Sequence, residues 1–273
     1  MNIFQIIGVI VVVVLLVIAC FPKKKKSEYV ISYDFQNPTE SMILPESLKE
    51  ISGLSFYKEN QLACVNDEKG SVFIYDLRKN EVTEQIEIGK DGDYEGIEVV
   101  GDEIFIMKSN GKIKGFKVNG GEERKIDCTH EDVKEYEGLS YNPTTKSLLL
   151  VTKELKKDKN NQKVIYAYHL EKETLAKYMT ISEDMTGGSK GKKAFAPSGI
   201  AVHPLTGELY IISSQGKKLL ILSAVGEKLA LVALDENLFR QPEGICFMPN
   251  GDLYISSEGE KGDGYILKFT STI

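Results

Sequence analysis

The sequence predicts an all-β chain folded as a single β-propeller, most simply with five four-stranded blades. A short phrase recurs five times along the chain, as Ile51-Ser52-Gly53-Leu54, Tyr94-Glu95-Gly96-Ile97, Tyr136-Glu137-Gly138-Leu139, Pro197-Ser198-Gly199-Ile200 and Pro242-Glu243-Gly244-Ile245. Its glycines are separated by 43, 42, 61 and 45 residues, close to the roughly 40–50 residues of one propeller blade. Short β-branched and aromatic runs punctuated by turns favour this all-β fold over an α/β fold.

Each copy of the phrase opens the strands of one blade. The first repeat continues into runs at 71–76 and 81–86, which are predicted as third and outer strands. The fourth repeat predicts strands at 200–202, 209–212 and 219–222, and the last predicts strands at 244–248, 253–256 and 264–269. In the last repeat, Pro249-Asn250-Gly251-Asp252 is a turn, because Asn-Gly supplies the positive φ that a tight hairpin needs.

The last repeat has no fourth strand of its own. The run 29–35 near the N-terminus has strand-like alternation, so we expect it to pair beside the final third strand and close the ring. Closure removes sheet edges that would otherwise promote aggregation. The longest repeat contains two polar stretches, 153–163 and 182–193, which we expect to be surface insertions, the first between second and third strands.

Composition limits the class of protein. The chain has 273 residues, and 42% of them are hydrophobic, which is enough for one continuous core over 29–273. Its formal net charge is −6, which argues against a nucleic-acid partner held through phosphate neutralisation. The cysteines Cys64, Cys128 and Cys246 have no metal-ligand spacing and are expected to be small buried residues.

The first 20 residues form a signal or membrane-anchor segment, followed by a basic tether at 21–28. Residues 1–19 carry no charged side chain, and Val17-Ile18-Ala19-Cys20 resembles a bacterial lipobox in which Cys20 is lipidated. Two features favour an uncleaved anchor instead: the first five residues contain no basic residue, and four lysines follow at 23–26. Both alternatives tether the domain to a membrane, and the lysines would meet anionic lipid headgroups.

One position of the repeated phrase predicts a ring of polar side chains. The innermost strands of a propeller line its central channel, so the residues before the repeated glycines should face one another at one mouth. They are Ser52, Glu95, Glu137, Ser198 and Glu243. Close carboxylates raise one another's pKa or recruit a cation, and Ca²⁺ prefers such oxygen ligands. Glu95, Glu137 and Glu243 are therefore the candidate metal ligands. The structural alternative is that they accept backbone N–H bonds from neighbouring blades.

A rim for a ligand is predicted beside this ring. It comprises Ser52, Ser198 and the turn Asn66-Asp67-Glu68, for which the alternative interpretation is a solvated Asx-turn. No Ser-His-Asp arrangement, nucleophile elbow or phosphate-binding glycine loop is evident, and His203 lies in a hairpin turn. The sequence thus identifies no catalytic residue.

These phrases together resemble the SdiA-regulated family of bacterial propeller proteins. The resemblance rests on Glu50-Ile51-Ser52-Gly53-Leu54, Asn66-Asp67-Glu68 with Gly70, Tyr94-Glu95-Gly96-Ile97-Glu98, Tyr136-Glu137-Gly138-Leu139, the run 197–204 and Pro242-Glu243-Gly244-Ile245. It implies a propeller attached to the inner or outer bacterial membrane and facing away from the cytoplasm. It implies little about activity.

Two functions from different classes remain. The first is a binding or scaffold module of the cell envelope that presents one rim to an unknown protein or small molecule, with a divalent cation such as Ca²⁺ in the channel. The second is a Ca²⁺-dependent hydrolase of the lactonase or phosphoesterase kind; sugar-lactonase-like propellers use a comparable glutamate-glycine element, an analogy of fold only. A hydrolase needs an open coordination position and a nearby general base. The ring offers carboxylates but no histidine, so we favour binding over catalysis.

Overall fold

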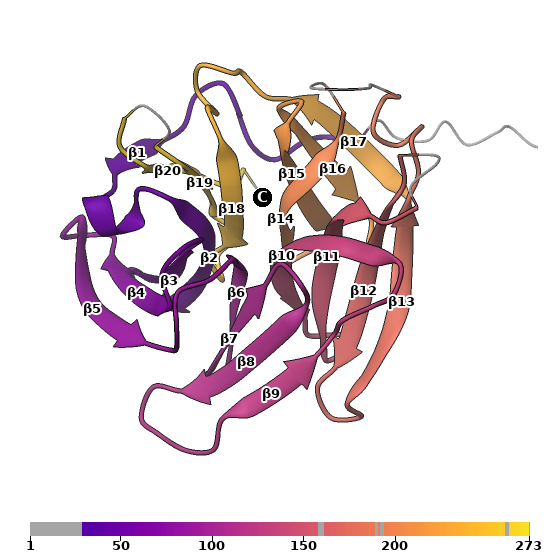
Figure 1. Cartoon of the computed structure of the whole chain (residues 1–273). Helices are drawn as coiled ribbons and strands as arrows, with labels where there is room; N and C mark the ends of the chain where they lie inside the picture. The colour runs from indigo at the N-terminus through magenta and orange to yellow at the C-terminus, as the bar shows by residue number, and fades with distance from the viewer. Residues whose placement is uncertain (1–28, 158–160, 189–190, 192–193, 260–261, 273) are drawn as a thin grey trace, which may run out of the picture. The chain divides into compact units, whose positions relative to one another are not determined.

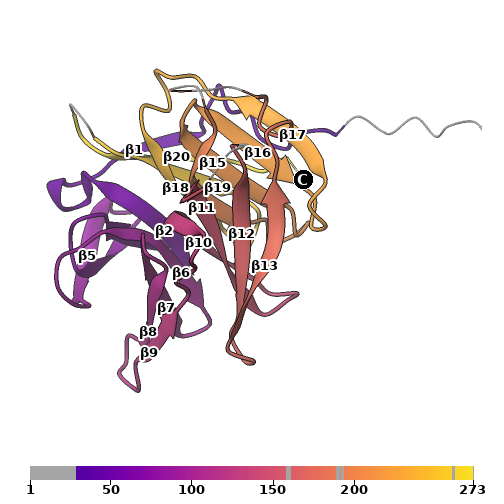
Figure 2. The same cartoon turned by 45° about the vertical axis from the view of Figure 1, so that its right-hand side comes forward.

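Five antiparallel sheets of four strands each stand around a central axis in the computed structural model (Figures 1 and 2). The structure describes residues 29–157, 161–188, 191, 194–259 and 262–272. The innermost strands contact one another in chain order, and the last contacts the first, so the sheets form a closed ring. The predicted fold class, a propeller of five four-stranded blades, is confirmed.

The blades follow one another along the chain, and each is named here by its order. Blade 1 holds β2 (Ile51–Lys58), β3 (Gln61–Asn66), β4 (Ser71–Asp76) and β5 (Glu81–Glu87). Blade 2 holds β6 (Tyr94–Val100), β7 (Glu103–Lys108), β8 (Lys112–Lys117) and β9 (Arg124–Asp127). Blade 3 holds β10 (Val133–Asn142), β11 (Ser147–Leu155), β12 (Lys163–His169) and β13 (Thr174–Ile181). Blade 4 holds β14 (Ala196–Val202), β15 (Leu209–Gln215), β16 (Lys218–Leu222) and β17 (Lys228–Ala233). Blade 5 holds β18 (Pro242–Phe247), β19 (Leu253–Ser257), β20 (Tyr265–Phe269) and the N-terminal β1 (Glu40–Ile43), and a short 3₁₀ helix, η1 (Glu46–Leu48), follows β1.

An N-terminal strand closes the ring, as predicted, but it is not the segment that the sequence indicated. The strand paired with β20 is β1, in which Met42 lies opposite Ile266. The predicted run 29–35 forms no strand in the structure. The alternating pattern of this run comes from Tyr33 and Phe35. Both side chains are buried although they belong to no sheet, and the ring of Phe35 packs against that of Phe269.

The closing strand offers a matched pair of variants. Met42 is 5% exposed and packs in the core shared by blades 5 and 1, whereas Ile43 is 67% exposed. We expect Met42→Asp to lower the free energy of unfolding by about 3 kcal/mol or more, because it buries a carboxylate and removes apolar contacts. Ile43→Asp should cost under about 1 kcal/mol. Urea denaturation of the two variants checks this, and equal losses would contradict the assignment of β1.

The polar insertions lie partly where they were expected. The stretch 153–163 was predicted to be a loop, but β11 continues to Leu155, so its first residues are strand. Lys153, which lies in the candidate site, is therefore held on a strand rather than in a loop. The second stretch, 182–193, does follow β13 and precede β14.

The repeated glycines bring the five inner strands close together at the axis. A Cβ atom at Gly96 would lie 2.8 Å from the Cβ of Leu139, and one at Gly138 would lie 2.8 Å from the Cα of Gly199. A Cβ at Gly199 would overlap the backbone oxygen of Glu243. Only glycine permits this approach of neighbouring blades. The space left beside them on the axis is about 10 Å³, close to that of one water molecule.

Candidate functional site

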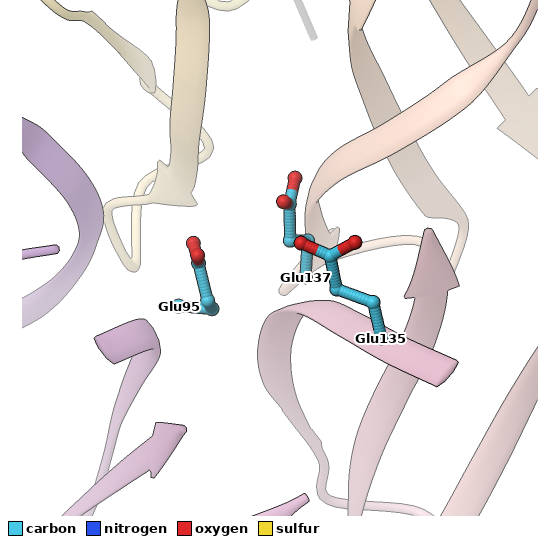
Figure 3. A group of neighbouring side chains, drawn as sticks. All are labelled: Glu95, Glu135 and Glu137. Carbon is cyan, nitrogen blue, oxygen red and sulfur yellow. The ribbon is translucent and has the colours of Figure 1, made fainter. Parts of the chain in front are cut away.

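Three carboxylates gather at the channel mouth where the inner strands begin (Figure 3). Glu95 comes from β6, and Glu135 and Glu137 come from β10. One oxygen atom from each lies within 4.8 Å of the others. The structure thus brings together two predicted ligands, Glu95 and Glu137, with a third carboxylate that the sequence reasoning missed. The signal for Glu135 was its position two residues before Glu137, because strand residues at i and i+2 point to the same side.

The serines at the equivalent ring positions make bonds between blades. The Ser52 hydroxyl donates to the backbone oxygen of Tyr94 at 2.6 Å, and the Ser198 hydroxyl donates to that of Pro242 at 2.7 Å. These two predicted rim residues are therefore engaged with the next blade and are almost fully buried. At the same position in blade 3, Glu137 contacts Lys153 of its own blade instead.

Lys153 of β11 lies among the carboxylates. Its Nζ contacts Glu137 and is 3.4 Å from Oε1 of Glu135. Burial lowers the pKa of Lys153, but the charges of Glu137 and Glu135 outweigh burial and raise it above its usual value. The ammonium group therefore stays charged and offsets part of the repulsion in the cluster.

Three of the carboxyl groups, those of Glu95, Glu137 and Glu243, hold protons more tightly than free glutamates. Burial, followed by the charge of Glu137, raises the pKa of Glu95 to about 10. Burial raises the pKa of Glu137 to about 7, although Lys153 opposes the shift. Burial and the charge of Glu137 also raise the pKa of Glu243 well above its usual value. Glu243 is thus coupled to the cluster but lies outside the group within 4.8 Å.

The predicted rim turn extends the acidic surface. The side-chain oxygen of Asn66 accepts from the amides of Glu68 and Lys69 at 3.0 and 3.2 Å, so this segment is an Asx-turn. Asp67 is half-buried, and its buried Oδ1 has no hydrogen-bond partner among the described residues. Burial, with the charges of Glu68 and Glu50, raises the pKa of Asp67.

His203, dismissed from the sequence as a turn residue, is a buried structural group. Its Nδ1 accepts from the amides of Leu205 and Thr206, and its Nε2 lies 2.8 Å from the Tyr33 hydroxyl. That hydroxyl donates to Gly251, so we assign the imidazole as neutral with its proton on Nε2. The residue joins the N-terminal segment to blades 4 and 5.

We expect His203 to contribute stability that is lost as the pH falls below about 6.5, because the imidazole then takes up a proton on unfolding. Burial lowers the folded-state pKa of His203, so the unfolded chain binds the proton first. The contribution is complete above the unfolded pKa and is lost as the pH falls through the folded one. Denaturant midpoints between pH 5 and 8 measure this contribution as a difference from the wild type. The stability advantage of the wild type over His203→Asn should shrink as the pH falls, whereas its difference from the control His169→Gln should stay constant; a constant difference for both variants would contradict the assignment.

Other sequence expectations concern residues away from the mouth. Cys64, Cys128 and Cys246 are free and buried, as predicted. The leader, Cys20 and the tetralysine lie outside the described residues. Within the described part of the chain, no helix is long and apolar enough to cross a membrane.

The family assignment follows from a match over most of the propeller. The family model described as SdiA-regulated matches residues 27–261. The chain belongs to the SdiA-regulated family. No curated protein matches the sequence significantly.

Solved structures share the fold at low sequence identity. The chain is similar to glutaminyl cyclase of Myxococcus xanthus, with 11% identity, a TM-score of 0.62 and coverage of 87% of this chain and 97% of that one. It is also similar to a streptogramin B lyase, with 12% identity, a TM-score of 0.55 and coverage of 85% and 97%. A chain of a nidogen/laminin complex matches with 16% identity, a TM-score of 0.53 and coverage of 77% and 72%. At these identities the likeness shows the fold alone, a fold that carries many functions.

Proposed function

We propose that this SdiA-regulated protein is a membrane-anchored binding propeller whose acidic channel mouth takes up a divalent cation. The observation that supports this most is the approach of oxygen atoms from Glu95, Glu135 and Glu137 to within 4.8 Å of one another. Groups with strongly raised pKa values are candidates for functional sites when they share a cavity or mouth. The unknown protein or small-molecule ligand would bind beside this cation at the part of the predicted rim that stays accessible, Asp67 and Glu68.

Ca²⁺ suits the donor set. It takes six to eight oxygen ligands in flexible geometry, and carboxylates can bind it through one oxygen or two. Glu95, Glu135 and Glu137 would be direct ligands, and Glu243 would contribute its charge. Because the pKa values of Glu95 and Glu137 are raised, the cation would displace protons, so its affinity should increase with pH. Lys153 competes for Glu137 and would weaken binding.

The alternative is a Ca²⁺-dependent hydrolase at the same mouth. The observation in its favour is Glu137, whose pKa of about 7 suits a general base. The space of about 10 Å³ on the axis admits no substrate into the channel, so a substrate would have to lie on the mouth. Binding without catalysis therefore remains the preferred proposal.

Calorimetric titration of the full-length chain with Ca²⁺ and Mg²⁺ tests the cation. Saturable binding of one ion per chain, with protons released into the buffer, is expected. The absence of binding at millimolar Ca²⁺ at pH 8 would remove the cation from the proposal. A screen of lactones and phosphoesters with the Ca²⁺-loaded chain then separates the two functions, because turnover that Glu137→Gln abolishes would favour the hydrolase.

The anchor is proposed to be a lipid on Cys20, which would place the domain in the bacterial cell envelope on the outer side of its membrane. Metabolic labelling with a palmitate analogue should mark the wild-type chain and not Cys20→Ala, and the variant should migrate differently because the leader is retained. Cys64→Ala serves as a control, since that thiol is buried. Equal labelling of wild type and Cys20→Ala would instead support an uncleaved anchor.

A further inference from the structure

A basic groove lies between blades 1 and 2, at the outer part of the ring. It encloses about 570 Å³, within the range of small-molecule sites. Five lysines line it: Lys90, Lys108, Lys112, Lys114 and Lys125. Asp127 is the one acidic residue among the described lining residues. The whole chain carries a formal net charge of −6, so the positive charge of this groove is opposite in sign to that of the chain as a whole.

Strand geometry sets these lysines together. Lys112 and Lys114 alternate along β8 on one face, and Lys125 of β9 lies directly opposite Lys114 in the antiparallel pair. Like charges in directly opposite positions destabilise a sheet. Further along the same face of β8, Phe116 is buried in the core between blades 1 and 2. The lysines thus occupy a face that elsewhere packs against the neighbouring blade.

The protein itself neutralises little of this charge. Lys114 is paired, since its Nζ lies 2.6 Å from Glu123 and donates to the backbone oxygen of Ile88 at 2.8 Å. Lys108 lies over the ring of Tyr94, 4.5 Å from its centre. Lys90, Lys112 and Lys125 have no described carboxylate within 4.0 Å of their ammonium groups, so these three charges are available to a bound anion.

The floor of the groove is apolar. Ile88 follows the outer strand of blade 1, and Ile106 and Tyr94 come from β7 and β6. All three side chains are nearly buried by the protein and expose little surface themselves, so the alkyl chains of the lining lysines supply most of the apolar contact that the groove offers. An organic ligand could place a flat apolar body on the floor and its charged group among the lysines.

We propose that this lysine groove binds an organic anion that joins a flat apolar body to a phosphate or carboxylate group. Ammonium groups form strong charge-assisted hydrogen bonds with both head groups, and the floor favours the organic anion over the inorganic ion. The proposal concerns other residues than the acidic mouth and does not depend on a cation there.

Calorimetric titration of the full-length chain at low ionic strength tests the groove with four probes: 1-naphthyl phosphate, 1-naphthoate, inorganic phosphate and 1-naphthylmethylammonium. We expect one site per chain for at least one of the naphthyl anions, weakening as salt is added, with inorganic phosphate at least about tenfold weaker. The stronger of the two anions identifies the head group. Saturable binding of neither anion, or equal binding of the cationic probe, would overturn the proposal.

Two double variants with the same change in net charge locate the site. Lys112→Gln/Lys125→Gln should weaken binding of the preferred anion about tenfold, because each removes one charge-assisted contact. Lys79→Gln/Lys172→Gln, exposed and outside the groove, should bind as the wild type does. Urea midpoints verify that both variants fold. Equal affinity in the two variants would also overturn the proposal, and unchanged anion binding by Glu95→Gln would separate this site from the acidic mouth.

Discussion

Excess Ca²⁺ is expected to raise the melting temperature of the wild-type chain by about 5–10 °C at pH 8 and to leave that of Glu95→Gln nearly unmoved. An ion that binds only the folded state stabilises it by about 2.7 kcal/mol at one hundred times Kd. For a domain of this size, 1 kcal/mol shifts the melting temperature by about 2–4 °C. Differential scanning calorimetry with and without Ca²⁺ measures both chains.

Glu95→Gln is the informative substitution because it resembles the metal-free state of the wild type. With its pKa raised from 4.5 to about 10, Glu95 is protonated at neutral pH when no cation is bound. Its shift lowers wild-type stability as the pH rises above 4.5, because the unfolded chain releases this proton and the folded chain retains it. Glutamine has no such proton to retain. Without metal the variant should therefore be at least as stable as the wild type, and increasingly so toward pH 8.

Glu137→Gln is a poorer test, because it also removes the ion pair with Lys153. Glu236→Gln is the matched control: Glu236 is exposed in the connection before blade 5, and the variant should keep the full response to Ca²⁺. Two results together would contradict the proposal: neither Ca²⁺ nor Mg²⁺ changes the wild-type melting temperature, and Glu95→Gln destabilises the metal-free chain. The carboxyl groups would then have a structural role, and the mouth would not be a cation site.

Gly199→Ala is expected to lower the free energy of unfolding by about 3 kcal/mol or more, because overpacking at a rigid contact cannot relax. The new methyl group would overlap the backbone oxygen of Glu243 in the next blade and lie 3.1 and 3.2 Å from the Cγ2 atoms of Ile245 and Ile212. Backbone atoms of an inner strand cannot move without shifting a blade. Urea denaturation of the full-length chain measures the loss.

Gly89→Ala is the control for the same chemical change. The nearest atom to a Cβ at Gly89 is the hydroxyl oxygen of Tyr94 at 3.6 Å, an ordinary contact. Replacing a glycine restricts the conformations of the unfolded chain. Gly89→Ala should therefore leave the free energy of unfolding unchanged or raise it by about 0.4–1 kcal/mol. If Gly199→Ala is as stable as Gly89→Ala, close approach at the axis does not explain the recurrence of glycine in the phrase.

The sequence predicted the blades because their signal is repeated. Glycine recurs at one structural position, where a Cβ atom would lie under 3.0 Å from its nearest neighbour in blades 2 to 5 and 3.2 Å from it in blade 1, and each glycine is followed by a buried strand. The closing strand was misplaced because β1 gives almost no signal: it has four residues, and only Met42 is buried. Tyr33 and Phe35 gave a stronger alternating pattern, but they are buried by packing of aromatic rings rather than by pairing in a sheet.

The candidate site was predicted in outline for the same reason. The ring position located Glu95 and Glu137 from repetition alone, whereas Lys153 has no counterpart in the repeated phrase. Its contact with Glu137 depends on how β11 crosses beside β10, which a linear pattern does not reveal. The lysine groove was missed because its residues come from separate strands of blade 2 and from the end of blade 1.

The pairing of β1 with β20 also sets an order of events during synthesis. Glu40 pairs with Lys268, so residues from opposite ends of the chain must meet before blade 5 is complete. Blades 1 to 4 are each built from consecutive strands and can form as the ribosome delivers them. The closing strand must wait, unpaired, until β20 has been made. Ring closure is therefore expected to be the last step of folding, and a nascent chain arrested before β20 should remain open and sensitive to proteases at its N-terminal strand.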